Sequence, residues 1–582
     1  MSLFQTNQCN GCQPAMIRRL HWVLLLSLTL AGVVISFLHL RTLSEPELRE
    51  WLTRWSGLFL GIHATLIVLL GILESERIIR IMRSRLPGRL LWMIPLLFMT
   101  GTLATAWLAP QTHRIYYDET IYLSIGQNLA HLNRAQICNS GGESYGQMQC
   151  DQGEYNKQPN GYPFLVSLLF RLAGTSEQAA FWLNNGLLGL TAVTVFLLIF
   201  PLGGGWRTGL FAALIVIFIP QNLHWFNTTS AEPAAALTVA MAILAGFYYR
   251  HVQTGSALIL LTLLTAFALS FRPESLLLLP LIALTTLPVI RTHPISLFVA
   301  LILFFCLTMP LWLHLGLFHN HPWGSSGKPF SLDYFSANLL TNGWHYLNNQ
   351  HHPLLFSLLA LLGLTSIRQR PLAVTVIILW FWFFWGIFLF FYAGSYQYGA
   401  DVRFSVVSSV PLALLAGLGS DALWHRSSRW TGNLPATRTG LMIALLGCSL
   451  FPFLPQIRAT THEAWAARAD VRFARQMVSH LPPEALVLTH NPNLFQLWGV
   501  HAAQLSLAST DPNYVNQALA NRYRGGIYLH FNFWCNVPDP VQNQFCDHVL
   551  SQYNSTQLVE FYEGNFRYAL HRLHPKPTPQ SP

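Results

Sequence analysis

Asp118 and Glu119 form a pair of carboxylates in the stretch YYDETIYLSIGQNLAH, just outside an apolar span, in a polar segment that covers residues 110–160. Ionisable groups beside a bilayer are costly unless they are solvated, paired or used. The pair therefore predicts a working site that faces water at the membrane surface. A carboxylate in such a site can act as a general base that takes a proton from an attacking hydroxyl group.

The same two acids also have a purely structural interpretation. Asp118 can cap the N-terminus of a helix, and Glu119 in the first turn would suit the helix dipole. Apolar residues follow at helical spacing, so this helix would lie along the membrane with its start held by the cap. These apolar residues are Ile121, Ile125, Leu129 and Leu132.

Other charged residues favour the chemical interpretation. Only 10% of the residues are charged, yet charges of both signs collect at the ends of apolar spans on the side where Asp118 lies. Each one alone has another explanation, because a single arginine near a membrane often extends past the lipid into water. Together they suit a cleft that holds an anionic group beside a general base. The residues are Lys157, His224, Glu232, Arg272, Glu274 and Arg403.

The composition places these residues in a membrane protein. Hydrophobic residues make up 52% of the chain, and the charged fraction is far below the roughly 25% of ordinary soluble domains. The formal net charge is +10, but the arginines stand mostly in short loops between apolar spans, where they orient helices in the membrane. We therefore predict an all-α polytopic membrane protein whose partners include membrane lipids and exclude nucleic acid.

Windows of about 20 apolar residues predict about thirteen transmembrane helices. The apolar piece 161–173 is too short for a crossing, so we expect it to lie at the interface, like the helix after Asp118. The predicted spans cover residues 20–40, 56–74, 89–109, 177–199, 207–221, 230–249, 255–271, 273–290, 295–315, 353–367, 371–393, 401–423 and 438–455.

Arginine-rich loops predict the orientation. With these spans, the arginines within 77–89, 368–370 and 426–438 all fall on the cytoplasmic side, as the positive-inside rule requires. The N-terminus is then cytoplasmic. The C-terminal region lies on the periplasmic or extracellular face of what we expect to be a bacterial or archaeal plasma (inner) membrane.

The chain divides into three segments of different character. Residues 1–88 form an extra two-helix membrane segment, and residues 89–455 form the transmembrane core with two large external loops, 110–160 and 316–352. Residues 456–582 are mixed and polar, and the strand-like runs EALVLTH, GGIYLHF and LVEFYEGNFRYALHRL predict a small external α/β domain. We expect this domain and the loop 316–352 to cover the cleft that holds the charged residues and to select what enters it.

The cysteines divide by predicted side. Two external pairs can each form a short-range disulfide in an oxidising compartment. On the cytoplasmic side, Cys9 and Cys12 form a CNGC motif, which lacks the second ligand pair of a common metal site. The external pairs are Cys138 with Cys150, and Cys535 with Cys546.

Several short stretches resemble glycosyltransferases of the GT-C fold, in particular the glycosyltransferase family 39 type that includes protein O-mannosyltransferases and aminoarabinose transferases. The resemblance covers about residues 89–455. DET-x-Y at 118–122 is its most specific stretch, and the order of the stretches along the chain carries more weight than any one of them. The shorter ones are K-x-P-x-G-Y-P at 157–163, SAEP at 230–233, RPE at 272–274 and DVRF-x-x-x-x-x-x-P at 401–411.

The resemblance implies a polyprenyl-phosphate sugar donor and transfer, with inversion, to a hydroxyl or amine of a lipid, glycan or protein acceptor. It makes Asp118 the general base and Glu119 a neighbouring acid of open role. Arginine holds phosphate oxygens with a fixed fork of donors, so cations would stabilise the leaving phosphate. The predicted phosphate ligands are Lys157, Arg403 and Arg272, and the predicted sugar and acceptor pocket contains Glu232, His224, Tyr396 and Tyr398. The two tyrosines could equally belong to an interfacial aromatic belt.

A divalent metal is left open, and no other cofactor is predicted. Some relatives place an acidic metal ligand just before the loop lysine, where this chain has Asn156, with Glu154 the nearest carboxylate. A group of histidines could supply ligands, but its spacing matches no standard metal motif. These are His314, His319, His321, His345, His351 and His352.

Two further classes of function are alternatives to a transferase. A transporter or flippase of lipid-linked sugars would place charges through the bilayer midplane, often with inverted repeats, and the sequence has neither pattern. A non-catalytic membrane assembly protein would use the external domain for binding and would tolerate loss of Asp118 and Lys157 together. The clustering of charges at one side favours the transferase.

Overall fold

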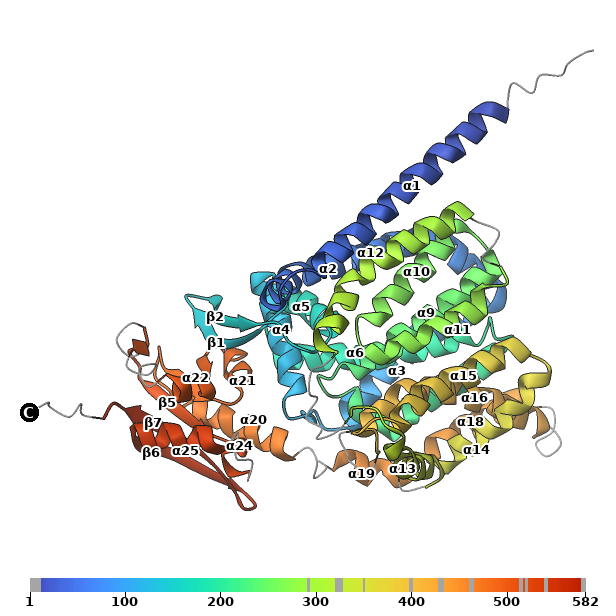
Figure 1. Ribbon diagram of the computed structural model, residues 1–582. Helices are drawn as coiled ribbons and strands as arrows, with labels where there is room; N and C mark the ends of the chain where they lie inside the picture. Colours follow the sequence, from blue (N-terminus) through green and yellow to red (C-terminus); the bar gives the residue numbers. More distant parts are fainter. Residues whose placement is uncertain are drawn as a thin grey trace, which may run out of the picture.

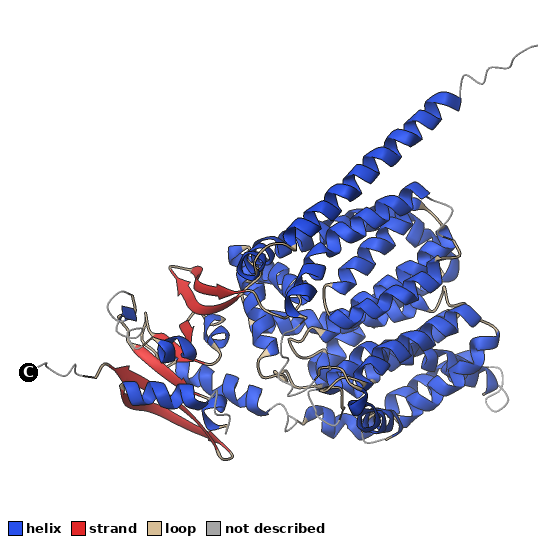
Figure 2. Ribbon diagram, in the orientation of Figure 1, coloured by secondary structure: helices blue, strands red, loops and turns tan. Residues whose placement is uncertain are grey.

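A computed structural model of the chain shows a large helical body with a mixed sheet at one side (Figures 1 and 2). The long helices of the body run side by side, and the strands gather beside one set of their ends. The structure describes residues 12–289, 294–319, 328–348, 351–396, 401–427, 434–459, 465–511, 517–518, 522–537 and 543–576.

Eight helical segments in the described residues are long and apolar enough to cross a membrane. This agrees with the predicted class, because runs of this length cover the hydrocarbon thickness of a bilayer and satisfy their own backbone groups. The segments are Glu45–Arg85 (α2), Gly88–Leu108 (ending in α3, Met93–Leu108), Glu177–Leu198 (α6), Glu232–Val252 (α9), Pro294–Phe318 (α12), Pro371–Leu389 (beginning with α15, Pro371–Gly386), Asp401–Arg426 (ending in α16, Ser405–Arg426) and Pro435–Arg458 (beginning with α18, Pro435–Cys448).

Shorter apolar helices occupy the other predicted spans, so every predicted window contains a helix, while the number of crossings stays a prediction. Residues 161–173 form a separate short helix, α5, as the sequence predicts, and its place at an interface is untested. The other helices of the body are α1 (Cys12–Leu40), α7 (Trp206–Phe218), α8 (Pro220–Trp225), α10 (Gly255–Leu269), α11 (Leu278–Thr286), α13 (Phe335–Leu347), α14 (Leu354–Gly363) and α19 (Leu454–Arg458).

The helix that starts at Asp118, α4 (Asp118–Leu132), differs from the prediction in two ways. Asp118 is its first residue and does not cap it: the N-cap position belongs to Tyr117, and no side chain caps this end. Most of α4 is buried, because it packs between α5 of the helical body and the sheet. The structural interpretation of Asp118 as a helix cap is therefore wrong, and its carboxylate is available for other contacts.

The sheet has seven strands in the order β2-β1-β4-β3-β5-β7-β6. Its central strands β4, β3 and β5 are parallel, and β7 and β6 form an antiparallel hairpin at one edge. The hairpin at the other edge, β1 and β2, comes from the first polar loop, more than 300 residues earlier in the chain (Figure 1). The strands are β1 (Ile137–Ser144), β2 (Gln147–Glu154), β3 (Leu486–Thr489), β4 (His501–Gln504), β5 (Ile527–Phe531), β6 (Asn554–Glu563) and β7 (Phe566–His574).

Helices cover both faces of the central strands, as parallel strands require. Val487 and Tyr528 belong to clusters with α20, whereas Leu488 and Leu529 pack with α22 and α25 on the opposite face. The three strand runs predicted after residue 455 are present as β3, β5 and the hairpin of β6 and β7. The helices of this region are α20 (Trp465–Val478), α21 (Pro492–Gln496), α22 (Leu505–Thr510), α24 (Phe533–Asn536) and α25 (Asn543–Gln552).

Close packing of α4 on α5 depends on a small residue. A Cβ atom at Gly126 would lie 2.6 Å from Cγ1 of Val166, so a larger side chain would push α4 away from α5. On its other side α4 is tied to the sheet region, where Gln127 Nε2 donates to the carbonyl of Gln496 at 3.2 Å. The position of α4, and hence of Asp118, is therefore set by both parts of the protein.

Both predicted external cysteine pairs are disulfide-bonded, with Cα atoms 5.7 Å apart in each pair. One joins β1 to β2, and the other joins α24 to α25. Cys9 lies outside the described residues.

Candidate active site

Four of the predicted site residues meet at one end of the helical body. Asp118 begins α4, and Glu232 begins α9, where a carboxylate also suits the helix dipole. Arg272 directly precedes the short 3-10 helix Pro273–Leu277, and Arg403 lies in the 3-10 helix Asp401–Phe404 that leads into α16. Residues from four distant parts of the chain thus form one cluster of charges, which we call the carboxylate–arginine cluster.

Glu232 is the centre of this cluster. Its Oε1 accepts from Nη1 of Arg272 at 2.5 Å and lies 3.1 Å from Nε of Arg403. The side chain of Glu232 is 2% exposed, and those of both arginines are 13% exposed. Buried charges of opposite sign stabilise one another only when geometry is good, and here one carboxylate oxygen bridges two guanidinium groups.

An aromatic ring and a further acid hold the arginines in place. The guanidinium carbons of Arg272 and Arg403 lie 5.4 and 5.0 Å from the centroid of the Phe404 ring, within the range of a cation–π contact. Glu274 Oε1 lies 2.7 Å from Nε of Arg272. Burial alone would lower the pKa of Arg272, but the ion pairs with Glu274 and Glu232 outweigh it and raise the pKa above its usual value.

Asp118 is the most accessible acid of the cluster, with a side chain that is 25% exposed. Its Oδ2 lies 3.6 Å from Nη2 of Arg403, and its Oδ1 accepts from Nε2 of Gln158 at 3.1 Å. The hydroxyl of Tyr122, one turn along α4, donates to Oε1 of the same Gln158 at 3.3 Å. The amide and the arginine orient the carboxylate while part of it stays open to an incoming group.

Glu119 makes structural contacts, and a part for it in catalysis beside Asp118 stays a prediction. Its side chain is fully buried, and Oε1 accepts from the backbone N–H groups of Arg114 at 2.6 Å and Ile115 at 3.0 Å. Oε2 accepts from the backbone N–H and the hydroxyl of Thr229, both at 2.9 Å, and pairs with Nδ1 of His113 at 2.9 Å. These bonds fasten the loop before α4 to the turn before α9.

The charge of Glu119 is matched by His113. Burial alone would lower the pKa of His113, but hydrogen bonds and ion pairs with Glu119 and Glu177 raise it to about 10. Burial would raise the pKa of Glu119, yet the contacts with His113 and the backbone donors lower it. A buried imidazolium–carboxylate pair therefore lies directly behind Asp118 and keeps the two helix starts together.

Lys157 and His224, two other predicted site residues, are not part of the carboxylate–arginine cluster. Lys157 is half-buried and directly precedes Gln158, and its backbone is hydrogen-bonded to His314. The ring of His224 donates to the carbonyl of Ile457 at 3.1 Å, and burial lowers its pKa to about 3. A neutral ring anchored to α19 does not serve the predicted pocket, so we do not retain His224 there.

Tyr396 is buried in the aromatic cluster that carries Phe404, and Tyr398 lies outside the described residues. The backbone N–H of Tyr396 donates to Oδ1 of Asn342 on α13 at 2.8 Å, and Nδ2 of Asn342 donates to the carbonyl of Gly394 at 2.9 Å. Helix α13, from the second large loop, therefore holds the segment that leads to Arg403. The burial of Tyr396 removes it from an interfacial aromatic belt.

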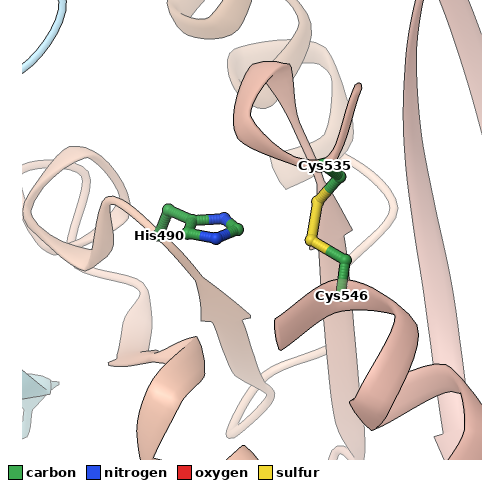
Figure 3. Close-up of side chains that lie close together, drawn as sticks. All are labelled: His490, Cys535 and Cys546. Atoms are coloured by element: carbon green, nitrogen blue, oxygen red, sulfur yellow. A yellow bond between two sulfur atoms is a disulfide. The ribbon is translucent and has the colours of Figure 1, made fainter. Parts of the chain in front are cut away.

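The described residues do not form a preorganised metal site near the cluster. The single described group of three candidate ligands is His490, Cys535 and Cys546, and both sulfur atoms belong to one disulfide (Figure 3). In the described part of the histidine group, the ring of His345 stacks on that of His351 with centroids 5.9 Å apart. In the carboxylate–arginine cluster arginines occupy the positions between the carboxylates, which does not fit a metal, so we derive no step through one.

Contacts between α4 and the sheet region were not predicted from the sequence. The hydroxyl of Tyr116 donates to Asp470 at 2.8 Å, and that of Tyr117 donates to the carbonyl of His490. Nδ2 of Asn491 donates to the hydroxyl of Thr120 at 3.1 Å. His490 and Asn491 follow the carboxyl end of β3, so the sheet holds the residues on both sides of Asp118. The one available signal was the tyrosine pair directly before the acids.

Asp470 gives this interface a pH dependence that can be measured. Burial raises its pKa to about 7, although Tyr116 and the backbone of Phe533 donate to it. The ordinary value is about 3.9, so between about pH 4 and pH 7 the folded protein keeps a proton that the unfolded chain has lost. We expect stability to fall as the pH rises through this window and to level off above it. Unfolding temperatures measured between pH 4.5 and 8 should show this slope for the wild type but not for Asp470→Asn. The control variant Asp547→Asn, at an exposed aspartate, should show the same slope as the wild type.

Comparison with solved structures identifies the architecture. ArnT from Cupriavidus metallidurans in the apo state aligns with a TM-score of 0.50 and 12% identity over 82% of this chain and 97% of ArnT. The chain has the GT-C fold. The GT-C fold predicted from the short stretches is thereby confirmed, and at this identity the likeness concerns the fold.

Other solved structures with this architecture align more weakly. ArnT bound to undecaprenyl phosphate has a TM-score of 0.48 and 12% identity over 82% of this chain and 98% of ArnT. The oligosaccharyltransferase of Archaeoglobus fulgidus in the apo form has a TM-score of 0.47 and 10% identity over 80% of this chain and 73% of its own. No protein-family profile and no curated protein sequence matches the chain.

Proposed function

We propose that this protein is a membrane glycosyltransferase that moves a sugar from a polyprenyl phosphate to a hydroxyl or amine of a lipid, glycan or protein acceptor. The observation that carries the proposal is the partly exposed carboxylate of Asp118, held beside the guanidinium of Arg403 at the ends of membrane helices. A base and a phosphate ligand are thus side by side in a protein with the GT-C fold. The residues perform three separate tasks.

Asp118 takes the proton. The acceptor oxygen attacks the anomeric carbon from the face opposite the phosphate, a new carbon–oxygen bond forms, and the acceptor proton passes to the carboxylate. Inversion follows from this single displacement. A carboxylate suffices as the base because deprotonation can lag behind bond formation in an oxocarbenium-like transition state.

Arg403 and Arg272 stabilise the leaving group. The bond between the anomeric carbon and the phosphate oxygen breaks, and its electron pair leaves with the polyprenyl phosphate, whose charge grows by one. Each guanidinium offers a fixed fork of donors, and partial burial strengthens its attraction to the phosphate. Lys157, in the loop next to Gln158, is the third cation that we assign to this task.

Glu232 orients the sugar. Its Oε1 is engaged by both arginines, whereas its buried Oε2 has no hydrogen-bond partner among the described residues. A buried carboxylate oxygen without a donor is costly, so a hydroxyl or amino group of the donor sugar would satisfy it. The donor's polyprenyl chain would lie in the bilayer, and we place the cluster on the external face, with the N-terminus in the cytoplasm.

Loss of the gene tests this function directly. Without the transferase its lipid-linked donor is not consumed, so we expect cells without the gene to accumulate one polyprenyl-phosphate sugar. The same sugar should be missing from one class of glycolipid, glycan or glycoprotein, as measured by mass spectrometry. Inverted vesicles loaded with that donor should then show transfer only when the protein is present. Unchanged glycoconjugates together with altered transbilayer movement of the donor would instead identify a flippase.

Substitution of Arg403 separates its charge from its shape. We expect Arg403→Gln to lower the rate of transfer on the order of 100-fold, and Arg403→Lys to recover part of that loss, because lysine restores the charge without the fork of donors. The assay is transfer from the accumulated donor in membranes that contain equal amounts of folded protein. Equal activity of wild type and Arg403→Gln would contradict a role in stabilising the phosphate.

A further inference from the structure

A large cavity lies at the other ends of the membrane helices, away from the carboxylate–arginine cluster. Its volume is about 760 Å³, and it is lined by the ends of α2 and α6, the second half of α9, residues of α10 and the first turn of α15. Helix α9 connects the two sites, because Glu232 begins it and Arg250 stands in its last turn. At about 1.5 Å per residue these positions are about 27 Å apart, close to the thickness of the hydrocarbon layer, so the cavity lies at the opposite side of the membrane.

The lining has two chemical zones. The walls consist mostly of aliphatic and aromatic side chains, including Leu197, Met241 and Leu264. Cationic side chains, those of Arg85, Arg250 and Arg370, reach the same cavity from three different helix ends, and none of its lining residues is acidic. An apolar space with a positive margin is complementary to an amphiphile with a negatively charged head group.

The positive charges at the margin of the cavity are not neutralised by carboxylates of the described residues. None of these three arginines forms an ion pair with a carboxylate in the described part of the chain, whereas Arg77 and Arg80 on the same end of α2 are paired with Glu74 and Glu76. Nη1 of Arg250 donates to the carbonyl of Thr285 at 3.2 Å, which fixes one side of its guanidinium and leaves other donors available.

Arg370 is also held in a defined place. Its guanidinium lies against the bare backbone of Gly203, where an added Cβ atom would be 3.3 Å from Nε, and the φ of +80° at Gly203 is a conformation that glycine adopts readily. Two loops, one after α6 and one before α15, are thus shaped so that a guanidinium enters the margin of the cavity. The arginines are therefore positioned by the fold.

We propose that this cavity binds one anionic phospholipid of the surrounding bilayer, with an acyl chain between α2, α6 and α9 and the phosphate among Arg85, Arg250 and Arg370. Basic pockets between transmembrane helices are suited to anionic head groups, and the volume is in the range of ligand pockets. The inference is independent of sugar transfer, because the two sites lie on opposite sides of the membrane. The bound lipid would connect the extra N-terminal helix α2 to the core.

The test measures lipid binding by the purified full-length protein in detergent. Phosphatidylglycerol or phosphatidylcholine is titrated, and bound lipid is counted by native mass spectrometry. We expect one phosphatidylglycerol to bind at least tenfold more tightly than phosphatidylcholine, and the double variant Arg250→Gln with Arg370→Gln to lose on the order of tenfold in affinity. The matched control, Arg80→Gln with Arg83→Gln, removes two charges from the same end of α2 outside the lining and should bind as wild type does.

Two further arms identify the ligand and the place. Met241→Trp fills the apolar part and keeps every charge, so it should reduce binding of phosphatidylglycerol in protein that still unfolds at the wild-type temperature. Inorganic phosphate at millimolar concentration should fail to displace the lipid, since it lacks the acyl chain. Equal binding of both lipids, equal loss in the control, or displacement by phosphate alone would overturn the proposal.

Discussion

Asp118→Asn is expected to lower the rate of sugar transfer by at least about 100-fold while leaving the protein folded and inserted. Asparagine has nearly the same shape and can still accept from Gln158, but it cannot take a proton from the acceptor. The ion pair with Arg403 that is lost is long, 3.6 Å, and partly exposed, so its effect on stability is small. The measurements are the transfer rate from the accumulated lipid-linked donor and the unfolding temperature.

The chain provides a closely matched control. Asp421 on α16 has a side chain that is 24% exposed, against 25% for Asp118, and one of its carboxylate oxygens lies 3.9 Å from Nε2 of His425. Asp421→Asn should therefore keep full activity. If Asp118→Asn transferred sugar at the wild-type rate, Asp118 would not be the base. If cells in which Asp118 and Lys157 are replaced together kept normal glycoconjugates, a non-catalytic assembly role would be favoured instead.

Among the variants considered, Glu119→Gln is expected to lower the stability of the fold the most. The variant leaves the imidazolium of His113 without its closest counter-charge and turns one oxygen, which now accepts from the backbone, into a donor. Breaking a buried ion pair by removing one partner typically costs about 3–5 kcal/mol. We expect a clear fall in unfolding temperature, together with a loss of activity that follows the loss of folded protein.

Paired variants distinguish this structural role from a chemical one. Glu76→Gln removes a carboxylate from an exposed ion pair with Arg80 and should change the free energy of unfolding by less than about 1 kcal/mol. The double variant His113→Gln with Glu119→Gln removes both charges, so its cost should be less than the sum of the two single variants. Normal stability of Glu119→Gln combined with loss of transfer would favour a catalytic role for Glu119.

The neighbouring carboxylates show why local sequence could not separate their roles. Both begin the same helix and both suit its dipole, so periodicity and capping rules treat them alike. Their side chains point in different directions: Asp118 faces Gln158 and Arg403, whereas Glu119 faces Thr229, which lies 110 residues away. Which acid meets the open cluster is decided by contacts that the sequence order does not encode locally.

The first polar loop shows the same limit in the fold. Its hairpin has no strong strand signal, because Gly141, Gly142 and neighbouring polar residues occupy β1. The hairpin pairs within itself, and β1 joins the larger sheet through β4, where Ser140 lies opposite Ala503. Pairing with a strand from a distant part of the chain cannot be predicted from the propensity of the hairpin itself. The predicted external loop and C-terminal domain consequently share one sheet.

The sequence by itself determined the features that depend on composition and short-range pattern. Long apolar runs must form helices in a bilayer, so the helical body followed from hydropathy, and scarcity of charge made the few charged helix ends conspicuous. Asp118, Glu232, Arg272 and Arg403 could be selected on that basis. Only the tertiary structure decided that these four meet, that Glu119 and His224 have structural contacts, and that a cavity with a positive margin lies at the other ends of the helices, because burial and ion pairing depend on which helix ends pack together.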